Sequence, residues 1–558
     1  LLDFSGDLNL HSLIINGFLK QMRIRKIHWA LWLLLGMLYL TALFMPLMEN
    51  DSAQFAVMAM NMAQENDYWH LYKNGVDYLD KPHMHYWLAA VSFELFGYTS
   101  WAYRFPAFLS LILGAYSLFR LGSLVKNKSF GSITAFVFLS TQTMLLAAFD
   151  LRTDTVLVSF VAFSLWKLLV YSHTQRLADI AIAAFAAAIA FSTKGMLALV
   201  VIGFSFLSYI YLQKSWRVLL SYKIIVGLIV FFLSLSPVLY AYYLQFDLHP
   251  EKVIRGVSDR SGVRFILWDQ SFERLSGTGH GKNSNGFFFF FHTALWVLLP
   301  YSFYVIVQGF RFSINALSIR LKPIWFAFLA LIPLFLLMSL SQFKLPHYLN
   351  VLMPLFALVI AHGVQATPVG IWRKLIAYSS FVLVGVYFLA SVAILLVFNP
   401  NLFTALFFLG SWILMGYLHF SKRISHFYLM LSSAFLFNLL GFFHFYPNLL
   451  EYQSGSVLHK RIPTNATLYN YSDDYIWALD FNRKKSSVPL SQNELKGLPK
   501  DSYIYVDQSH YTEFKRAHPS AVEQASASHY RITRLNFRFL NRSTRSQQLG
   551  VKRILYVP

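Results

Sequence analysis

Two polar clusters follow the first long apolar run, and they hold the side chains best suited to chemistry. The cluster 49–55 reads Glu-Asn-Asp-Ser-Ala-Gln-Phe and carries Asp51, and the cluster 78–87 reads Tyr-Leu-Asp-Lys-Pro-His-Met-His-Tyr-Trp and carries Lys81. A carboxylate can take a proton from a reacting hydroxyl, and an ammonium group can hold a phosphate. Asp51 is equally good material for a helix start, since Asn, Asp and Ser favour that position. The long, acidic and aromatic segment between them is where we predict an active site.

Further charged and polar groups stand at the ends of later apolar runs or in the loops between them. They are Asp154, close to Asp150 and Arg152, and the potential phosphate ligands Lys194, Arg274, Lys344 and Tyr348. Each has an ordinary explanation. A carboxylate is favoured at a helix N-terminus, and a lysine beside an apolar run can extend to the membrane interface. Phosphate binding is the alternative that explains several of these cations together.

Four histidines, His83, His85, His280 and His347, raise the possibility of a metal site. Their spacing is not that of a metalloprotease motif, and single histidines near an interface are usually only polar. The sequence therefore leaves metal binding open.

The composition requires a membrane. Of 558 residues, 56% are hydrophobic, 18% aromatic and only 13% charged, which is more apolar surface than a soluble protein of this length can bury. The net charge of +21 would suggest a nucleic-acid partner in a soluble protein, but here the positive residues fall mainly in short loops between apolar runs. We therefore expect contact with anionic lipid headgroups and no nucleic acid. The absence of cysteine excludes disulfides and thiolate metal sites.

The apolar runs predict about thirteen transmembrane helices. They lie near 28–48, 104–124, 130–148, 155–172, 178–193, 196–213, 224–244, 287–310, 323–341, 348–363, 375–398, 402–420 and 427–446. The stretch 83–98 competes with these, but Glu94 and two histidines would be costly in lipid, so we assign it to an interfacial helix.

The positive charges orient the chain. Lysines and arginines precede the first run and recur in alternate loops, for example at Lys126, Lys128, Arg373 and Lys374. By the positive-inside rule that face is cytoplasmic. The segment 1–27 is then a cytoplasmic N-terminal segment, and residues 1–19 do not resemble a signal peptide. The transmembrane part covers 28–446, and its loops 49–103 and 245–286 lie on the other, non-cytoplasmic face.

Residues 447–558 differ in character and are predicted to form a small soluble domain on the non-cytoplasmic face, α/β or mostly β. Polar stretches alternate there with β-rich runs at 467–471, 503–506, 535–539 and 554–557.

Six short motifs, taken together, resemble one family. They are Asp51 to Ala56, Tyr78 to Pro82 with Tyr86 to Leu88, Arg104-Phe105-Pro106, Arg152-Thr153-Asp154, Thr193-Lys194-Gly195, and Lys344 to Tyr348. They resemble bacterial polyprenyl-phosphate-sugar-dependent glycosyltransferases, in particular the aminoarabinose transferases of lipid A and the protein O-mannosyltransferases. The resemblance covers roughly residues 28–446.

The resemblance implies an all-α, multi-span membrane fold called GT-C in a bacterial inner membrane, with a periplasmic active site and C-terminal domain. It implies transfer of one sugar from a polyprenyl (undecaprenyl) monophosphate to a lipid, glycan or protein acceptor. This sequence differs from the family pattern at two acidic positions. The family's usual Asp-Glu pair is Asp51-Ser52 here, and a Glu that helps to hold zinc in the aminoarabinose enzymes is replaced by Asp80. No cofactor is required by this reading, although a divalent metal on Asp80 and Asp269 is an open possibility.

The physical chemistry of such a transfer agrees with these residues. A sugar leaving from a phosphate monoester needs no proton on the leaving group, but it needs positive charge there, which Lys81 and Arg274 can supply. Asp51, with Asp154 as the second catalytic candidate, can act as the base for an acceptor hydroxyl, and the displacement inverts the anomeric centre. The alternatives are a transporter or flippase of lipid-linked sugars, and a polymerase or ligase that uses pyrophosphate-linked oligosaccharides.

Overall fold

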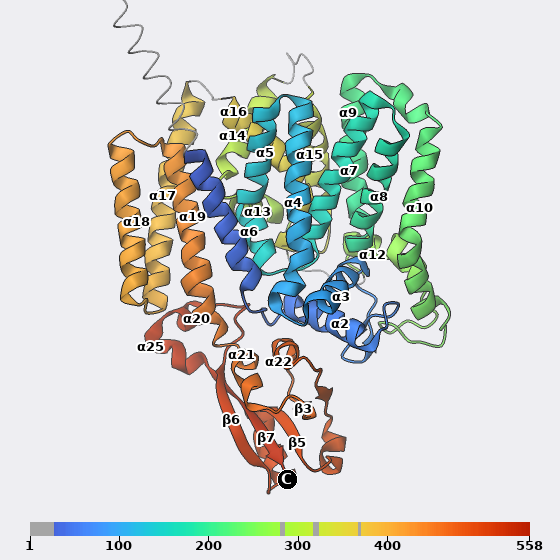
Figure 1. The fold of residues 1–558 in the computed structure, drawn as a ribbon, viewed down its shortest axis with the longest axis vertical. Coiled ribbons are helices and arrows are strands. Elements are labelled where there is room, and N and C mark those ends of the chain that lie inside the picture. Colours follow the sequence, from blue (N-terminus) through green and yellow to red (C-terminus); the bar gives the residue numbers. More distant parts are fainter. Residues whose placement is uncertain (1–26, 279–284, 316–322, 367–369) are drawn as a thin grey trace, which may run out of the picture.

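The structure is a computed structural model that describes residues 27–278, 285–315, 323–366 and 370–558. Nearly all of the predicted N-terminal segment, and His280, lie outside the described residues. The described chain forms a bundle of apolar helices with a small sheet domain at one end of it (Figure 1).

Long apolar helices build the bundle. In chain order they are Ile27–Phe44, α4 (Ser100–Val125), α5 (Lys128–Ser140), α6 (Gln142–Phe149), α7 (Asp154–Thr174), α8 (Leu177–Lys194), α9 (Leu197–Gln213), α10 (Lys223–Tyr242), α13 (Phe289–Val297), α14 (Ser302–Asn315), α15 (Trp325–Leu340), α16 (Met353–Gln365), α17 (Ile371–Val397), α18 (Leu402–Phe420) and α19 (His426–Leu440). Within the described ranges, nine helical stretches are long and apolar enough to cross a bilayer, and the pair α5 and α6, bent by 53°, makes ten. Helices occupy all thirteen predicted runs, but the number of spans stays a prediction.

The stretch 83–98 is largely helical, as predicted, and its position at the membrane interface stays a prediction. Helix α3 (Met84–Phe96) and helix α2 (Asp51–Glu65) lie at the end of the bundle that faces the sheet domain (Figure 1). Asn50 caps α2 by accepting a hydrogen bond from the Ser52 backbone N–H at 2.8 Å, as its side-chain type predicts. A short hairpin of β1 (Tyr72–Lys73) and β2 (Val76–Asp77) connects the two helices.

The long loop before α13 is partly helical. It contains the segments Tyr243–Asp247 and Phe265–Asp269, both with π-helical hydrogen bonds, then α11 (Gly262–Arg264) and α12 (Gln270–Ser276). A 3-10 segment, Pro346–Leu352, leads into α16. Of these pieces, α12 is labelled at the same end of the bundle as α2 and α3 (Figure 1).

The C-terminal residues form a five-stranded mixed sheet in the order β4-β3-β5-β7-β6. Its strands are β3 (Leu468–Tyr471), β4 (Val488–Pro489), β5 (Ser502–Asp507), β6 (Val522–His529) and β7 (Gly550–Val557). The helices that accompany it are α21 (Ser454–Leu458), α22 (Trp477–Arg483), α23 (Gln508–Ala517), α24 (Phe537–Leu540) and α25 (Arg542–Arg545), whereas α20 (Tyr446–Leu450) ends the helical stretch that begins at His426. The sheet confirms the α/β alternative. The β-rich run 535–539 was wrong as a strand, because Asn536 caps α24 there by accepting from the Phe539 N–H at 2.8 Å.

The sheet domain is attached to the helix that begins at Asp51. The buried Glu49 carboxylate accepts a hydrogen bond from the Ala478 N–H of α22 at 3.0 Å, and Gln453 contacts the backbone of both Leu47 and Glu49. Apolar side chains of α22, Trp477 and Phe481, complete the core between α2 and α3. The position of α2 therefore depends on the C-terminal residues.

Candidate active site

One buried arginine joins the two acidic segments of the site. Arg104 of α4 is 2% exposed, and its guanidinium donates to the carbonyl of Pro46 at 3.2 Å and to that of Phe149 at 3.1 and 3.0 Å. It thereby holds the segment before Asp51 against the segment before Asp150. The arginine of the Arg104-Phe105-Pro106 motif therefore has a structural role. A buried guanidinium must donate its hydrogen bonds to nearby acceptors, and here these are backbone carbonyls of the two segments.

Asp51 and Asp150 share one cation. Arg152 contacts a carboxylate oxygen of Asp51 at 3.1 Å and one of Asp150 at 3.2 Å. The Asp51 side chain is 48% exposed, so its carboxylate is open to a substrate. Asp150 is a close sequence neighbour of Arg152, but the contact with Asp51 joins parts of the chain that lie far apart in the sequence.

Asp154 forms a buried ion pair with Lys194. The Nζ of Lys194 lies 2.6 Å from the Asp154 carboxylate, both side chains are about 5% exposed or less, and the ammonium also lies 5.1 Å from the ring centre of Tyr348. Asp154 begins α7 and Lys194 ends α8, so each charge stands where the helix dipole favours it. The structure thus brings three predicted site residues together.

A glycine lets a neighbouring loop approach this pair. Gly195 has φ +84°, and a Cβ there would lie 2.7 Å from the side-chain oxygen of Gln270. The amide nitrogen of Gln270 in turn donates to the backbone carbonyl of Asp80 at 2.5 Å. The Thr193-Lys194-Gly195 motif therefore ends in glycine because another side chain packs against it, and this contact connects α8 to the Asp80-Lys81 segment.

Within the described part of the chain, three cations surround Asp80. Its carboxylate lies 3.0 Å from Lys81, 3.1 Å from Arg274 and 3.3 Å from Arg255. Burial, followed by the charge of nearby Arg274, lowers the pKa of the Lys81 ammonium to about 8, although Asp80 acts in the opposite direction. The excess of positive charge in this group is suited to an anionic ligand.

A cavity of about 310 Å³ lies beside this group and is lined by one of its cations, Arg274, and by Lys194. Its polar wall is made by Lys194, Arg274, Ser271, Ser341 and Tyr348, and the rest of its lining is apolar, with Met196, Leu197, Val200, Phe272, Leu275, Phe290, Leu337 and Met338. A cationic end and an apolar body in one cavity match the two parts of a lipid that carries a phosphate.

Lys344 differs from the other predicted phosphate ligands. Its side chain is buried, and its Nζ donates to the backbone carbonyls of Asn285 at 2.9 Å and Gly286 at 3.2 Å. These contacts favour a role in fixing the segment before α13 over direct phosphate binding. The predicted role of Lys344 as a ligand gains no support from this geometry.

The two carboxylates proposed for a metal do not fit one. Asp80 already faces three cations, which a metal ion would have to displace, and Asp269 contacts Arg264 at 3.4 Å. His83 instead contacts the Trp69 carbonyl at 3.1 Å, and His85 contacts the Tyr103 hydroxyl at 2.9 Å, so both histidines have structural partners.

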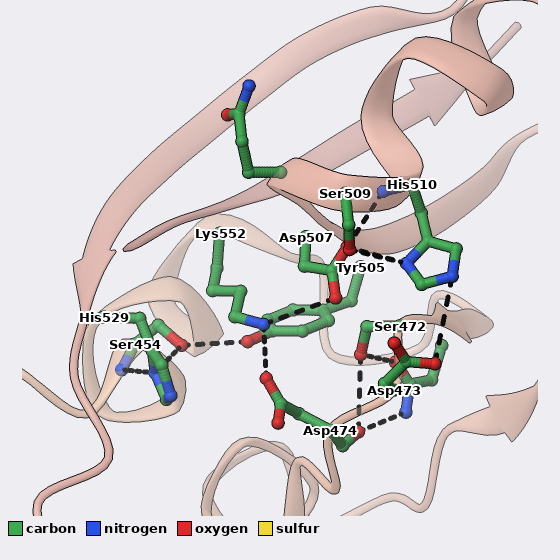
Figure 2. Close-up of polar contacts among 12 residues, drawn as sticks. Ser454, Ser472, Asp473, Asp474, Tyr505, Asp507, Ser509, His510, His529 and Lys552 are labelled. Atoms are coloured by element: carbon green, nitrogen blue, oxygen red, sulfur yellow. Dashed lines mark hydrogen bonds and ion pairs between the residues drawn. The ribbon is translucent and has the colours of Figure 1, made fainter. Parts of the chain in front are cut away.

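The sheet domain holds one group with metal-ligand chemistry, the only one found in the described part of the chain. Asp473, Asp507 and His510 lie together beyond the ends of the parallel strands β3 and β5 (Figure 2). Lys552 enters the same group and contacts both Asp474 and Asp507. Asp507 is also the N-cap of α23, where it accepts from the His510 N–H at 3.0 Å and lies 2.7 Å from the His510 ring.

Several residues of the site are not recognisable from the sequence. Arg255 lies in a loop with φ +54° and reaches Asp80 only through the fold, and Glu273 contacts Arg255 at 3.6 Å and Arg260 more closely. Gln270 is an ordinary polar residue in sequence. Only the spacing of several charges in the loop 245–286 could have drawn attention to them.

Comparisons with known proteins agree with this arrangement. Residues 80–241 match the family described as dolichyl-phosphate-mannose-protein mannosyltransferase. The chain is 28% identical over 353 residues to undecaprenyl phosphate-alpha-4-amino-4-deoxy-L-arabinose arabinosyl transferase 2 of Pseudomonas fluorescens, a match that covers 60% of this chain and 59% of the relative. It is 22% identical over 325 residues to the protein of the same name in Proteus mirabilis, covering 57% and 56%. The matched regions thus span less than two thirds of either relative.

The fold comparison covers nearly the whole chain. The crystal structure of ArnT from Cupriavidus metallidurans bound to undecaprenyl phosphate superimposes with a TM-score of 0.70 at 16% identity, covering 94% of this chain and 97% of that chain. At such low identity the likeness speaks for the fold. The chain therefore has the membrane-embedded GT-C fold, with a small sheet region at its C-terminus.

Proposed function

We propose that this protein is an integral-membrane glycosyltransferase of a bacterial inner membrane, which moves one sugar from a polyprenyl monophosphate to a lipid, glycan or protein acceptor. The observation that carries the proposal is the cavity with Lys194, Arg274 and Tyr348 at one end and an apolar body. The matched relatives are named as transferases that use an undecaprenyl phosphate sugar, and ArnT was crystallised with undecaprenyl phosphate.

In this proposal the donor phosphate binds among Lys81, Arg274 and Lys194. Arg274 and Lys81 both contact Asp80 at about 3 Å, so the two cations lie close enough together to act on one phosphate. Their charges stabilise the phosphate as the bond between it and the anomeric carbon breaks. The isoprenoid chain occupies the apolar part of the cavity.

Asp51 is the proposed base. Its exposed carboxylate, fixed by Arg152 at 3.1 Å, takes the proton of an acceptor hydroxyl while that oxygen bonds to the anomeric carbon from the side opposite the phosphate. The configuration at that carbon is inverted. If the acceptor is itself a phosphate, no proton moves, and Asp51 positions the acceptor. Asp154 touches Lys194 in this structure, so we assign it to holding that cation in place.

We place the active site and the sheet domain on the periplasmic face. The positive residues Lys126, Lys128, Arg373 and Lys374 stand at the other end of the bundle, since each lies at the helix end remote from Asp51 and the sheet domain. We also propose the boundaries 28–446 for the transmembrane part and 447–558 for the C-terminal domain.

The test is incubation of the purified full chain with a panel of polyprenyl-phosphate sugars and a membrane lipid extract, followed by mass spectrometry. We expect free polyprenyl phosphate and an acceptor heavier by one sugar residue. A transporter or flippase would leave the mass of every lipid unchanged in the same mixture. Consumption of only pyrophosphate-linked oligosaccharides would instead identify a ligase or polymerase, and either result would overturn the proposal.

A further inference from the structure

Two arginines of the sheet domain bind the end of a long apolar helix. Helix α17 is among the stretches long and apolar enough to cross a bilayer, and Figure 1 shows α25 beside its last turn. Arg542 donates to the carbonyls of Leu395 and Val397, each at 3.1 Å. Arg545 donates to the Val397 carbonyl at 2.7 Å, and its guanidinium lies 4.7 Å from the ring centre of Phe398. Cations are favoured at a helix C-terminus. Because the apolar run of α17 ends here, α24 and α25 lie at the level of the bilayer surface.

The segment 531–545, which contains α24 and α25, is basic and holds no acidic residue. Its sequence is Arg-Ile-Thr-Arg-Leu-Asn-Phe-Arg-Phe-Leu-Asn-Arg-Ser-Thr-Arg. Arg531, Arg534 and Arg538 are exposed, and none of the three forms an ion pair within the part of the chain that the structure describes. Glu451, exposed nearby beside Tyr452, reduces this positive charge without cancelling it. The three guanidinium groups are therefore available to a negatively charged surface.

The same segment exposes apolar side chains between its arginines. Phe537 is 80% exposed, and Leu535 is also exposed. Phe539, by contrast, is buried and stacks on Tyr530 with ring centres 3.9 Å apart, which fixes α24 on the sheet domain. Exposed aromatic and aliphatic side chains that alternate with arginines, at the end of a membrane-spanning helix, are typical of segments that lie in the membrane interface.

Net charge, rather than a phosphate contact, selects the surface that this segment fits. Phosphatidylethanolamine and phosphatidylglycerol both carry a phosphate, but only phosphatidylglycerol gives the bilayer a net negative charge. Basic residues near a membrane respond to that surface potential, and each changes binding by about five-fold. Three exposed arginines without acidic partners should therefore make the contact sensitive to the net charge of the bilayer.

We propose that the segment 531–545 is an interfacial contact with a bilayer that contains anionic phospholipid. In this contact Phe537 lies among the headgroups and upper acyl chains, and Arg531, Arg534 and Arg538 face the negatively charged surface. The contact holds the sheet domain against the membrane. It does not depend on the proposed transfer reaction.

The experiment measures lipid contact at one labelled position of the full chain. The sequence contains no cysteine, so Phe537→Cys provides a single thiol for a nitrobenzoxadiazole dye. The protein is placed in nanodiscs of phosphatidylcholine, with or without an equal amount of phosphatidylglycerol, that contain a lipid spin-labelled near its headgroup. We expect this lipid to quench the dye several-fold more strongly when phosphatidylglycerol is present.

Val522→Cys is the matched control position. Val522 is 53% exposed and pairs with Tyr556, close to the C-terminus that Figure 1 marks at the end of the sheet domain remote from the bundle. A dye there should be quenched by aqueous iodide and not by the spin-labelled lipid.

Charge reversal and salt test the role of the arginines. Arg534→Glu combined with Arg538→Glu should remove the effect of phosphatidylglycerol on the labelled chain. The control pair Lys500→Glu and Arg516→Glu, at exposed positions elsewhere in the sheet domain, should leave that effect unchanged. Raising the salt from about 0.1 M to about 1 M, which shortens the screening length from about 10 Å to about 3 Å, should remove the effect with all arginines in place.

Three results would overturn the proposal. The first is equal quenching by lipid at positions 537 and 522. The second is quenching at 537 that is the same with and without phosphatidylglycerol, since the contact would then not depend on anionic lipid. The third is protection of the dye at 537 from both the spin-labelled lipid and iodide, because protein would then cover the segment.

Discussion

Replacing Lys81 by alanine should weaken donor binding while the surrounding structure persists. The Asp80 carboxylate would keep Arg274 at 3.1 Å and Arg255 at 3.3 Å, so no buried charge loses all its partners. The group of three cations and one carboxylate falls from a net charge of about +2 to about +1. One charge-assisted contact to phosphate is worth roughly 1.5–3 kcal/mol, which corresponds to a loss of affinity of about ten- to a hundred-fold.

The pH dependence of binding separates a charge effect from a structural one. The pKa of Lys81 is lowered to about 8, so the side chain is charged below that pH and loses its proton as the pH rises through it. Affinity of the wild type for polyprenyl phosphate should therefore fall between about pH 7 and pH 9. Lys81→Arg should recover part of the affinity and remove this fall, because a guanidinium stays charged and its planar fork does not replace a compact ammonium.

The assay is direct binding of polyprenyl phosphate to the purified variants. Lys374→Ala, an exposed lysine near the start of α17, is the matched control. It is preferable to Lys223, whose Nζ donates to the Gln175 carbonyl at 2.6 Å and so supports the structure. Equal affinities for Lys81→Ala and Lys374→Ala, or an unchanged pH profile in Lys81→Arg, would refute the assignment of Lys81 to the donor phosphate.

Three further predictions concern the base, the orientation and the glycine. Asp51→Asn should abolish sugar transfer and leave donor binding near normal, because the amide cannot take a proton; near-normal turnover would remove Asp51 from the mechanism. A reporter fused after Pro558 should be active only outside the cytoplasm, and activity only inside would reverse the assigned orientation. Gly195→Ala should lower the free energy of unfolding by about 1–2 kcal/mol, and with it the melting temperature, and should reduce sugar transfer. The reason is that φ is +84° and the new Cβ would lie 2.7 Å from Gln270. Gly203→Ala, with nothing within 4 Å of its Cβ, is the control, and equal melting temperatures for the two would contradict the packing argument.

The residues of the candidate site fall into two groups. In the proposed reaction, Lys81, Arg274 and Asp51 act on the substrate, whereas Arg104, Gln270 and Gly195 hold the segments that carry those side chains. The second group makes only backbone and packing contacts, so its substitution should change activity and stability together.

The sequence by itself determined the membrane class, the approximate positions of the apolar helices and the side of the bundle where polar residues gather. These follow from local properties, since about twenty apolar residues must span the bilayer and positive loops remain on one side. The same reasoning found α3, because Glu94 and the two histidines exclude lipid. Asp51, Lys81, Asp154 and Lys194 were also recognisable, since their types carry chemistry wherever they stand.

Only the tertiary structure decided how these residues combine. Asp51 and Arg152 lie 3.1 Å apart across a long stretch of chain, and Asp80 collects Arg255 and Arg274 from a loop whose polar residues form no periodic pattern. Lys344, which the sequence places among the predicted phosphate ligands, contacts two backbone carbonyls. The strand β6 was missed because its residues are mostly exposed and polar, and 535–539 became a helix through the cap at Asn536. Charged side chains and capping residues interact with the groups that lie close to them in space. Those distances depend on the packing of the whole bundle and cannot be predicted from a local sequence pattern.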